Sequence, residues 1–229
     1  MIYVCSDIHG RYDKYLKVFD IVTPDDTLYI LGDVIDRSPD GIIILQDIQK
    51  HNNIEFFCGN HEFMMYLAMF DSNKIVNEYY KGIWIYAANG GYSTYCALNS
   101  LSENEKLKIK NMILSSTVFR RITIKNTRYY LSHAGVNLRY NSYDYMRFKD
   151  VDKTVLESLL WDSCLAYNTP ISNNETIIVG HRYVQHYHNS NKAYRLGNII
   201  DIDGGLAIRD DSISNLILLR LDDNTEFYL

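Results

Sequence analysis

The sequence predicts an α/β protein whose sheet is at least partly parallel. A short apolar run, a polar loop and an amphipathic stretch follow one another three times within the first 70 residues. This order is typical of βαβ units. The chain has 229 residues, of which 47% are hydrophobic and 22% are charged, and this composition fits one globular domain over residues 1–229.

The three units begin with short buried strands and continue as helices. The expected strands are residues 2–5, 27–31 and 54–58. The expected helices lie around 15–22, from near Pro39, where proline suits a first turn, and over 63–70. Because parallel strands present their carboxyl ends at one edge of a sheet, the three polar loops are expected to converge there.

Residues 71 to about 118 differ from this rhythm. Their apolar residues are scattered, and a polar helix is expected over 102–113, so we interpret them as a small helical insertion packed over the sheet edge. From residue 119 strand patterns return. The expected elements are a hairpin that turns near 125–126, a buried strand over 176–181, and two closing strands in NIIDIDGG and NLILLRL.

Composition and charge exclude several classes of protein. The net charge of -5, without a run of Lys or Arg, argues against a general nucleic-acid surface. No apolar stretch is long enough for a membrane span, and no signal peptide precedes Ser6-Asp7. The four cysteines form no C-x-x-C pair, and Cys5 and Cys58 fall in strands. We therefore expect buried free thiols in a reducing, cytoplasmic environment.

Five predicted strands end in a carboxylate, an imidazole or an amide. These side chains are Asp7, His9, Asp33, Asn60, His61, His133 and His181. One histidine at a strand end is more often structural than a ligand, but five such ends in one chain indicate a metal site. Mixed Asp, His and Asn ligands suit manganese, iron or zinc better than calcium or a thiolate zinc site.

The number of candidate ligands favours two ions over one. Two ions can share a bridging carboxylate, and Asp33, in the middle loop, is the natural bridge. Two dications against Asp7 and Asp33 leave a charge of about +2, because neutral imidazole and amide ligands add none. Such a site attracts a phosphate dianion, and ions ~3.5–4 Å apart suit in-line displacement at phosphorus.

These residues resemble the motifs of the phosphoprotein phosphatase (calcineurin-like metallophosphoesterase) family over residues 1 to about 205. The motifs are Asp7-x-His9-Gly10, Gly32-Asp33-x-x-Asp36-Arg37, Gly59-Asn60-His61-Glu62, His133-Ala134-Gly135 and Gly180-His181. IDIDGG and the run from Trp84 through Asn89-Gly90-Gly91 to Thr94 are similar to the bacterial and phage branch, which holds Ser/Thr/Tyr phosphatases and symmetrical diadenosine tetraphosphatases. The resemblance implies a four-layer fold, a central β-sandwich of mixed sheets flanked by helices, with the helical insertion over the active site.

The resemblance also implies a role for each motif residue. The first metal would be held by Asp7, His9 and Asp33, and the second by Asp33, Asn60, His133 and His181. His61 would be the general acid, Asp36 would orient it, and Arg37 would bind phosphate. A metal-bridging hydroxide would attack, and the cofactors would be two divalent transition-metal ions, manganese in preference to iron or zinc. Glu62 is expected to cap or brace its turn.

The sequence departs from the family pattern near Trp161. Phosphatases of this branch carry an Arg shortly after this Trp, whereas Asp162 and Ser163 follow it here. Arg182, directly after His181, is the candidate to bind phosphate instead. Ser6 and Ser38 replace the usual glycines.

Three functions remain open. The leading one is a Ser/Thr (phosphoprotein) phosphatase, acting on a phosphorylated protein or a small phosphate ester. The alternative is a symmetrical dinucleoside polyphosphate hydrolase, which would need aromatics to stack on bases. The candidates for stacking are Tyr79, Tyr80, Trp84, Tyr86 and Tyr92. An inactive scaffold on the same fold is a third reading, and the intact ligand set argues against it.

Overall fold

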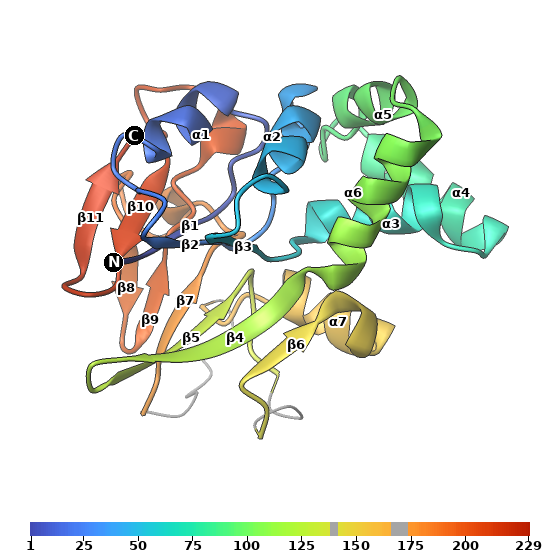
Figure 1. The fold of residues 1–229 in the computed structure, drawn as a ribbon. Helices are drawn as coiled ribbons and strands as arrows, with labels where there is room; N and C mark the ends of the chain where they lie inside the picture. The colour runs from blue at the N-terminus through green and yellow to red at the C-terminus, as the bar shows by residue number, and fades with distance from the viewer. Residues whose placement is uncertain (138–141, 166–173) are drawn as a thin grey trace.

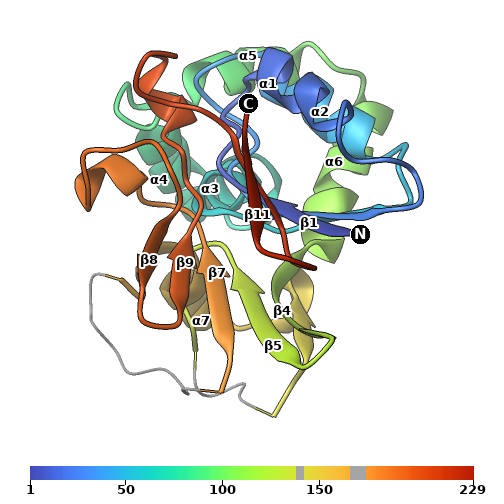
Figure 2. The ribbon, with the colours of Figure 1, turned by 90° about the vertical axis from the view of Figure 1, so that its left-hand side faces the viewer.

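The computed structural model describes residues 1–137, 142–165 and 174–229. Two mixed β-sheets pack face to face, with helices on their outer faces (Figures 1 and 2). Within the described residues the strand orders are β11-β10-β1-β2-β3 and β6-β4-β5-β7-β9-β8. The expected sandwich of mixed sheets flanked by helices is confirmed.

The elements have the following bounds. The first sheet contains β1 (Ile2–Cys5), β2 (Thr27–Ile30), β3 (Ile54–Phe56), β10 (Ile217–Arg220) and β11 (Thr225–Tyr228). The second contains β4 (Thr117–Ile124), β5 (Thr127–Ser132), β6 (Tyr145–Arg147), β7 (Thr176–Val179), β8 (Tyr194–Leu196) and β9 (Ile199–Asp201). The α-helices are α1 (Tyr12–Val18), α2 (Asp40–Ile48), α3 (Asn60–Phe70), α4 (Lys74–Ile85), α5 (Tyr92–Asn99), α6 (Glu103–Ser115) and α7 (Lys153–Trp161). Short 3₁₀ turns cover Phe148–Asp150, Val184–His186 and Leu206–Ile208.

Each sheet contains three parallel strands. β1, β2 and β3 run parallel in the first sheet, and β5, β7 and β9 do so in the second. The hairpin of β4 and β5 turns where it was expected. The other pairings are antiparallel. The parallel strands therefore bring their carboxyl ends, and the polar loops that follow them, to one side of the sandwich.

Alternating side chains build the core between the sheets. Val4 of β1 faces the second sheet, whereas its neighbours Tyr3 and Cys5 pack among the residues beneath the helices. The inter-sheet cluster also includes Tyr29, Leu31, Phe57, Leu131, Ile178, Ile200, Ile217 and Leu219. Burying each aliphatic side chain contributes about 1.5–3 kcal/mol, so this layer fixes the register from which the loops emerge.

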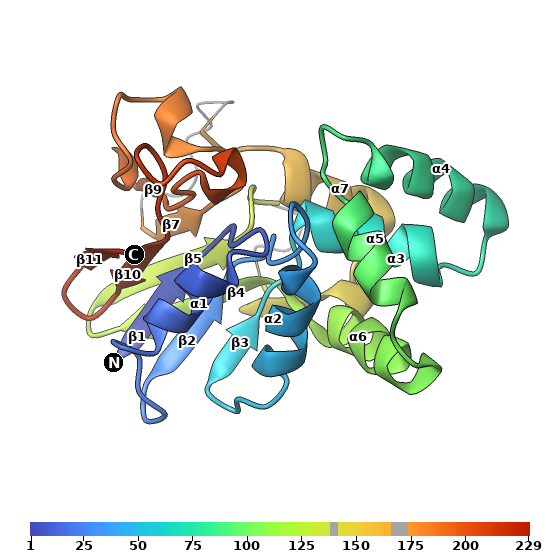
Figure 3. The same ribbon diagram turned by 90° about the horizontal axis from the view of Figure 1, so that it is seen from above.

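Helices α4, α5 and α6 gather with α3 on one side of the molecule (Figure 3), in the segment expected to be a helical insertion. The assignment of 1–229 as a single domain stays a prediction. α3 begins at Asn60, earlier than the expected start at Phe63, because Gly59 is its N-cap and Glu62 accepts the Gly59 N–H.

All four cysteines are free, and Cys5, Cys58 and Cys164 are buried. The expectation of buried free thiols at Cys5 and Cys58 is confirmed. No helix in the described part of the chain combines the length and apolar character needed to cross a membrane.

Candidate active site

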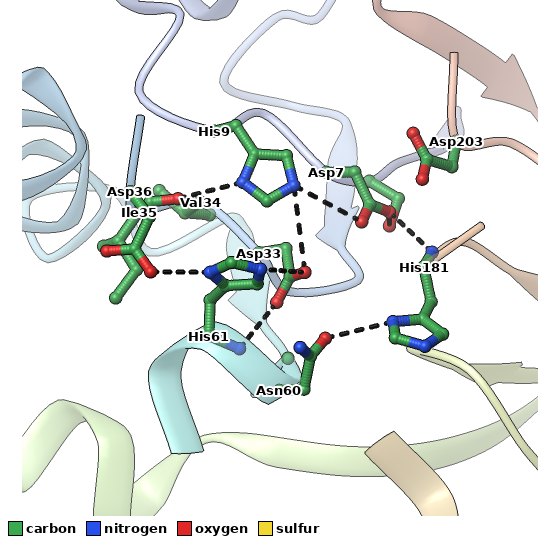
Figure 4. A network of polar contacts seen from close by, with 12 residues as sticks. Asp7, His9, Asp33, Val34, Ile35, Asp36, Asn60, His61, His181 and Asp203 are labelled. Atoms are coloured by element: carbon green, nitrogen blue, oxygen red, sulfur yellow. Dashed lines mark hydrogen bonds and ion pairs between the residues drawn. The ribbon is translucent and has the colours of Figure 1, made fainter. Parts of the chain in front are cut away.

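The loops after β1, β2, β3 and β7 bring most of the predicted residues together (Figure 4), and His133, after β5, contacts Asp33 and Asn60 of the same group. Several of these residues have left-handed backbones although they are not glycine. They are Asp7 (φ 54°), His9 (46°), Asp33 (51°), Asp36 (73°), Arg37 (67°) and His181 (75°). Such conformations cost on the order of 1–3 kcal/mol each and persist only where the surroundings enforce them.

Glu62 supplies much of that enforcement. Its fully buried carboxylate accepts the backbone N–H groups of Asp33 (2.9 Å), Val34 (2.9 Å) and Ile35 (3.2 Å). It also accepts the N–H of Gly59 at 2.9 Å. One side chain thus joins the loop after β2 to the start of α3, and the expectation that Glu62 braces its turn is confirmed.

Asp33 lies between two groups of possible metal donors. The first group is His9, Asp33 and His61, and the second is Asp33, His133 and His181; within each group the donor atoms lie within 4.8 Å of one another. Asp33 Oδ2 is 3.8 Å from His9 Nε2 and 3.5 Å from His133 Nε2. Asp33 is the member common to both groups, which is the position a bridging carboxylate would need.

The ring nitrogens of His9 and His133 are oriented as metal ligands require. His9 Nδ1 lies 3.1 Å from Ile35 O, and His133 Nδ1 lies 2.8 Å from Leu31 O. These carbonyl oxygens accept the single N–H of a neutral imidazole, so each Nε2 keeps a lone pair directed into the site.

Asn60 faces two imidazoles. Its Oδ1 is 2.9 Å from His133 Nε2 and 3.0 Å from His181 Nδ1. Because His133 already donates its one N–H to Leu31, its Nε2 and the Asn60 oxygen present lone pairs to each other. A cation between them would satisfy both atoms.

Asp7 has one occupied and one free oxygen. Its Oδ2 accepts the Ser6 hydroxyl and, at 3.0 Å, the backbone N–H of His181. Its Oδ1 is buried without a hydrogen-bond partner and lies 4.0 Å from His9 Nε2. A side chain at Gly180 would collide with Asp7, so glycine is required where β7 meets this carboxylate. The free Oδ1 is a vacant donor position beside the first group.

The pKa shifts of the buried aspartates and histidines are those expected of a cation-binding site. Burial, and then neighbouring carboxylates, raise the pKa of Asp7 and Asp33 well above the usual range. Burial also lowers the pKa of His9 and His133 well below theirs, and lowers that of His181 to about 4. Neutral imidazoles and crowded carboxylates are unfavourable alone, and bound divalent cations would stabilise both. The residues present therefore fit the two-ion expectation.

His61 is held by a buried chain of hydrogen bonds. Its Nδ1 lies 2.6 Å from Asp36 Oδ2, and its Nε2 lies 3.7 Å from Asp33 Oδ2. The indole N–H of Trp84 donates to Asp36 Oδ2 at 2.8 Å, and the backbone N–H of Asp36 donates to the Thr94 hydroxyl at 3.0 Å. The sequence reasoning found the His61–Asp36 pair but missed the contribution of Trp84.

The suggestion that Trp84 stacks on a base is wrong, because its side chain is completely buried. Its burial follows from the bond to Asp36 and from Gly91, where any side chain would collide with the indole. Tyr86 and Tyr92 are exposed, and neither lines the pocket between α3, α4 and α7.

A pocket of about 490 Å³ lies between α3, α4 and α7. Its lining residues are Met64, Tyr79, Tyr80, Ile83, Asn89, Thr154, Glu157, Ser158, Trp161 and Asp162. Met64 is one helical turn beyond His61, and Asn89 precedes Gly90, whose carbonyl accepts the backbone N–H of Arg37 at 3.0 Å. The pocket therefore reaches the turn of α3 next to His61, and no predicted metal donor is among its lining residues.

The two arginines predicted to bind phosphate differ in their surroundings. Arg37 Nε is buried without a hydrogen-bond partner, next to Asp36 in the site. Arg182 is exposed, and among the described residues its side chain forms no ion pair. The phosphate-binding role of each stays a prediction.

The sequence profile of the calcineurin-like phosphoesterases matches residues 1–204. The chain belongs to the calcineurin-like phosphoesterase family. The expectation of a phosphoric ester hydrolase is thereby confirmed at the level of the family, and the two His/Asp groups agree with the family's use of two metal ions.

Curated relatives of this phosphoesterase match over a limited segment. The symmetrical bis(5'-nucleosyl)-tetraphosphatase of Wigglesworthia glossinidia brevipalpis is 35% identical over 80 residues, which is 33% of this chain and 29% of that protein. The enzyme of the same name from Salmonella typhimurium is 35% identical over 72 residues, which is 30% and 25%. The matched segment spans less than a third of these relatives.

Solved structures agree with the fold over the whole chain. A structure assigned as a diadenosine tetraphosphatase has a TM-score of 0.60 at 14% identity, covering 100% of this chain and 92% of that one. A serine/threonine phosphatase from Saccharomyces cerevisiae has a TM-score of 0.53 at 16% identity, covering 100% and 78%. At these identities the likeness shows the fold alone.

The role of Glu62 leads to a stability prediction. Glu62→Gln places an amide N–H₂ among backbone donors and removes a charge-assisted acceptor, so the metal-free protein is expected to lose about 1.5–3 kcal/mol of unfolding free energy. Urea unfolding followed by circular dichroism measures this loss. Glu78→Gln is the matched control, because Glu78 is exposed on α4, and its effect is expected to stay within about 0.5 kcal/mol. An equal effect of the two substitutions would contradict the bracing role.

The position of Asp33 leads to a prediction about metal content. Asp33→Asn is expected to weaken binding of both ions, each by at least about tenfold, because the two donor groups share this carboxylate. His181→Ala is the comparison, since His181 belongs to one group only. Elemental analysis of manganese-reconstituted protein measures the outcome. Loss of a single ion in the Asp33 variant would make Asp33 an ordinary terminal ligand.

Proposed function

We propose that the chain hydrolyses dinucleoside polyphosphates at a phosphoanhydride bond, using two divalent transition-metal ions, manganese by preference. The single observation that carries this choice is the pocket lined by Tyr79 and Tyr80, which includes Met64, one helical turn beyond His61. The names of the curated relatives point the same way, although they match over a part of the chain.

The residues that would hold the ions are those identified from the sequence. Asp7, His9 and Asp33 form the first set, and Asp33, Asn60, His133 and His181 form the second. When bound, the ions supply positive charge that binds phosphoryl oxygens and acidifies water. The free Asp7 Oδ1 and the inward lone pairs of His9 and His133 support this assignment.

The remaining side chains would position and protonate the substrate. Arg37 would bind a phosphoryl oxygen through its unpaired guanidinium N–H groups. In the protonated form of His61, Nδ1–H would donate a hydrogen bond to Asp36. Nε2–H would supply the proton that the leaving oxygen takes up. Water adds to the attacked phosphorus and one P–O bond breaks, so a dinucleoside tetraphosphate cleaved centrally yields two nucleoside diphosphates.

The chemistry of the pocket suits a nucleobase better than a phosphate. Tyr79 would offer an aromatic face, and a base stacked on such a ring gains about 1–3 kcal/mol, whereas Lys153 Nζ lies over the Tyr80 ring at 4.8 Å from its centre. The carboxylates of Glu157 and Asp162 also line the pocket. They would accept hydrogen bonds from an exocyclic amine and repel a phosphate. A base held here would leave the phosphates over the metal-donor groups.

A phosphoprotein phosphatase, the leading interpretation from the sequence, is the second candidate. It is supported by the family motifs, but the curated relatives favour the dinucleoside alternative. The absence of an Arg shortly after Trp161 also weakens the likeness to phosphatases of this branch.

A substrate comparison tests the choice. With manganese present, kcat/KM is expected to be higher for diadenosine tetraphosphate than for a phosphoserine peptide or p-nitrophenyl phosphate. Tyr79→Ala should lower kcat/KM for the dinucleotide by a factor equivalent to about 1–3 kcal/mol of transition-state stabilisation. It should leave kcat/KM for p-nitrophenyl phosphate unchanged. Tyr92→Ala, exposed on α5 outside the pocket, is the control. A preference for the phosphopeptide would favour the second candidate.

The acid role of His61 is tested with two matched esters. Phenolate leaves less readily than p-nitrophenolate, so phenyl phosphate depends more on a proton donor. His61→Ala is expected to lower kcat for phenyl phosphate by roughly 10²–10⁴-fold and for p-nitrophenyl phosphate by much less, with manganese content retained. Equal losses accompanied by loss of manganese would assign His61 a structural or ligand role.

A further inference from the structure

Arg209 has an unusual position for an exposed arginine. It follows the 3₁₀ turn Leu206–Ile208 with a left-handed backbone, φ 63°. Its NH2 group donates to the backbone carbonyl of His9 at 3.0 Å. The turn is itself fixed, because Gly205 donates its N–H to the buried carboxylate of Asp203 at 2.9 Å. The chain therefore holds this guanidinium against the loop after β1.

The two acidic residues that follow Arg209 in the chain bind other partners and form no ion pair with it. The Asp210 carboxylate accepts from Ser212 instead. Asp211 pairs with Arg11 at 2.7 Å and with Lys14 at 3.5 Å. Among the described arginines, those without a carboxylate within 4.0 Å are Arg37, Arg147, Arg182 and Arg209.

Two of these unpaired arginines belong to one loop cluster. Arg37 follows Asp36, and the loop after β1 packs on this segment, since the Gly10 N–H donates to Val34 O at 2.7 Å. Burial, Arg11 and Arg37 lower the pKa of Arg209, whereas Asp13 and Asp40 act in the opposite direction. Neither arginine has a carboxylate within 4.0 Å among the described residues, so a bound anion would stabilise the charge of each.

The side of His9 on which Arg209 lies determines which phosphate it can reach. The His9 imidazole points into the first donor group, whereas Arg209 contacts the backbone carbonyl of that residue. Arg209 thus contacts the backbone of a donor residue, and its hydrogen bond to the His9 carbonyl involves none of the donor atoms. A phosphoryl group at the metal donors would lie nearer to Arg37, and the next phosphate along a chain would reach Arg209.

We propose that Arg209 binds a phosphate of a polyphosphate substrate beyond the one that reacts, while Arg37 binds the reacting phosphate, and that Arg209 thereby acts in place of the arginine absent after Trp161. This inference rests on the proposed function for the identity of the substrate. It differs from the earlier assignment of that role to Arg182, whose exposed side chain forms no hydrogen bond with a described residue.

The test measures binding and does not depend on turnover. Manganese-loaded protein is titrated calorimetrically with orthophosphate and with the magnesium complex of methylene-bridged tripolyphosphate, which cannot be hydrolysed. Arg209→Gln keeps a donor for the His9 carbonyl but removes the charge, and Arg209→Ala removes both. Arg147→Ala is the matched control, because Arg147 is also unpaired and exposed but lies on β6, and Arg182→Ala tests the competing assignment.

Both Arg209 variants are expected to bind the tripolyphosphate analogue at least about tenfold more weakly, the loss of one charge-assisted contact. Their affinity for orthophosphate should change less than about twofold, and their manganese content should not change. The Arg147 and Arg182 variants should resemble the parent protein. Parent-like binding by Arg209→Gln, equal weakening for both anions, or weakening in Arg182→Ala instead would overturn the proposal. The binding test uses no dinucleotide. A failure of the protein to cleave diadenosine tetraphosphate would therefore count against the proposed function without deciding whether Arg209 binds polyphosphate.

Discussion

The buried carboxylate of Glu62 accepts four backbone N–H groups, three from the loop after β2 and one from the N-cap of α3. Without it, these N–H groups would be buried and unsatisfied, at a cost of about 1–3 kcal/mol each. The bonds fix Asp33 and His61 relative to each other, and His61 adds a backbone N–H bond to Asp33 Oδ1 at 3.0 Å. The left-handed conformations of this loop depend on that support.

With the loops fixed in this way, the site concentrates groups that repel one another. Asp7 and Asp33 are buried with further carboxylates nearby, and burial lowers the pKa of His9 and His133, which disfavours their protonated forms. The hydrogen bonds of the braced loops and the apolar contacts of the inter-sheet core offset the cost of this repulsion. Divalent cations would relieve the repulsion, so binding of metal and stability of the folded chain are expected to be coupled.

The helices between α3 and β4 contribute both to the metal-donor edge and to the neighbouring pocket. Trp84, near the end of α4, holds Asp36 and through it His61. Gly90 accepts the N–H of Arg37, and Tyr79 and Tyr80 line the neighbouring pocket. One segment therefore orients the proposed acid, positions an arginine and forms the surface that a nucleobase would contact. Changes in this segment would alter substrate preference without altering the metal donors.

The sequence by itself determined the order of the first three strands and polar loops, and with it the convergence of Asp7, His9, Asp33, Asn60 and His61, because the carboxyl ends of parallel strands meet at one edge of a sheet. His133 and His181 follow strands of the second sheet, so their meeting with these residues depends on how the two sheets pack. The hairpin, the polar helix and the bracing by Glu62 also follow from local patterns. Only the tertiary structure decided that Trp84 supports Asp36 and is no stacking surface, and that Arg209 lies beside His9. These contacts join residues 48 and 200 positions apart. No local periodicity encodes such pairs, since they depend on how the insertion and the carboxyl-terminal loop pack against the sandwich.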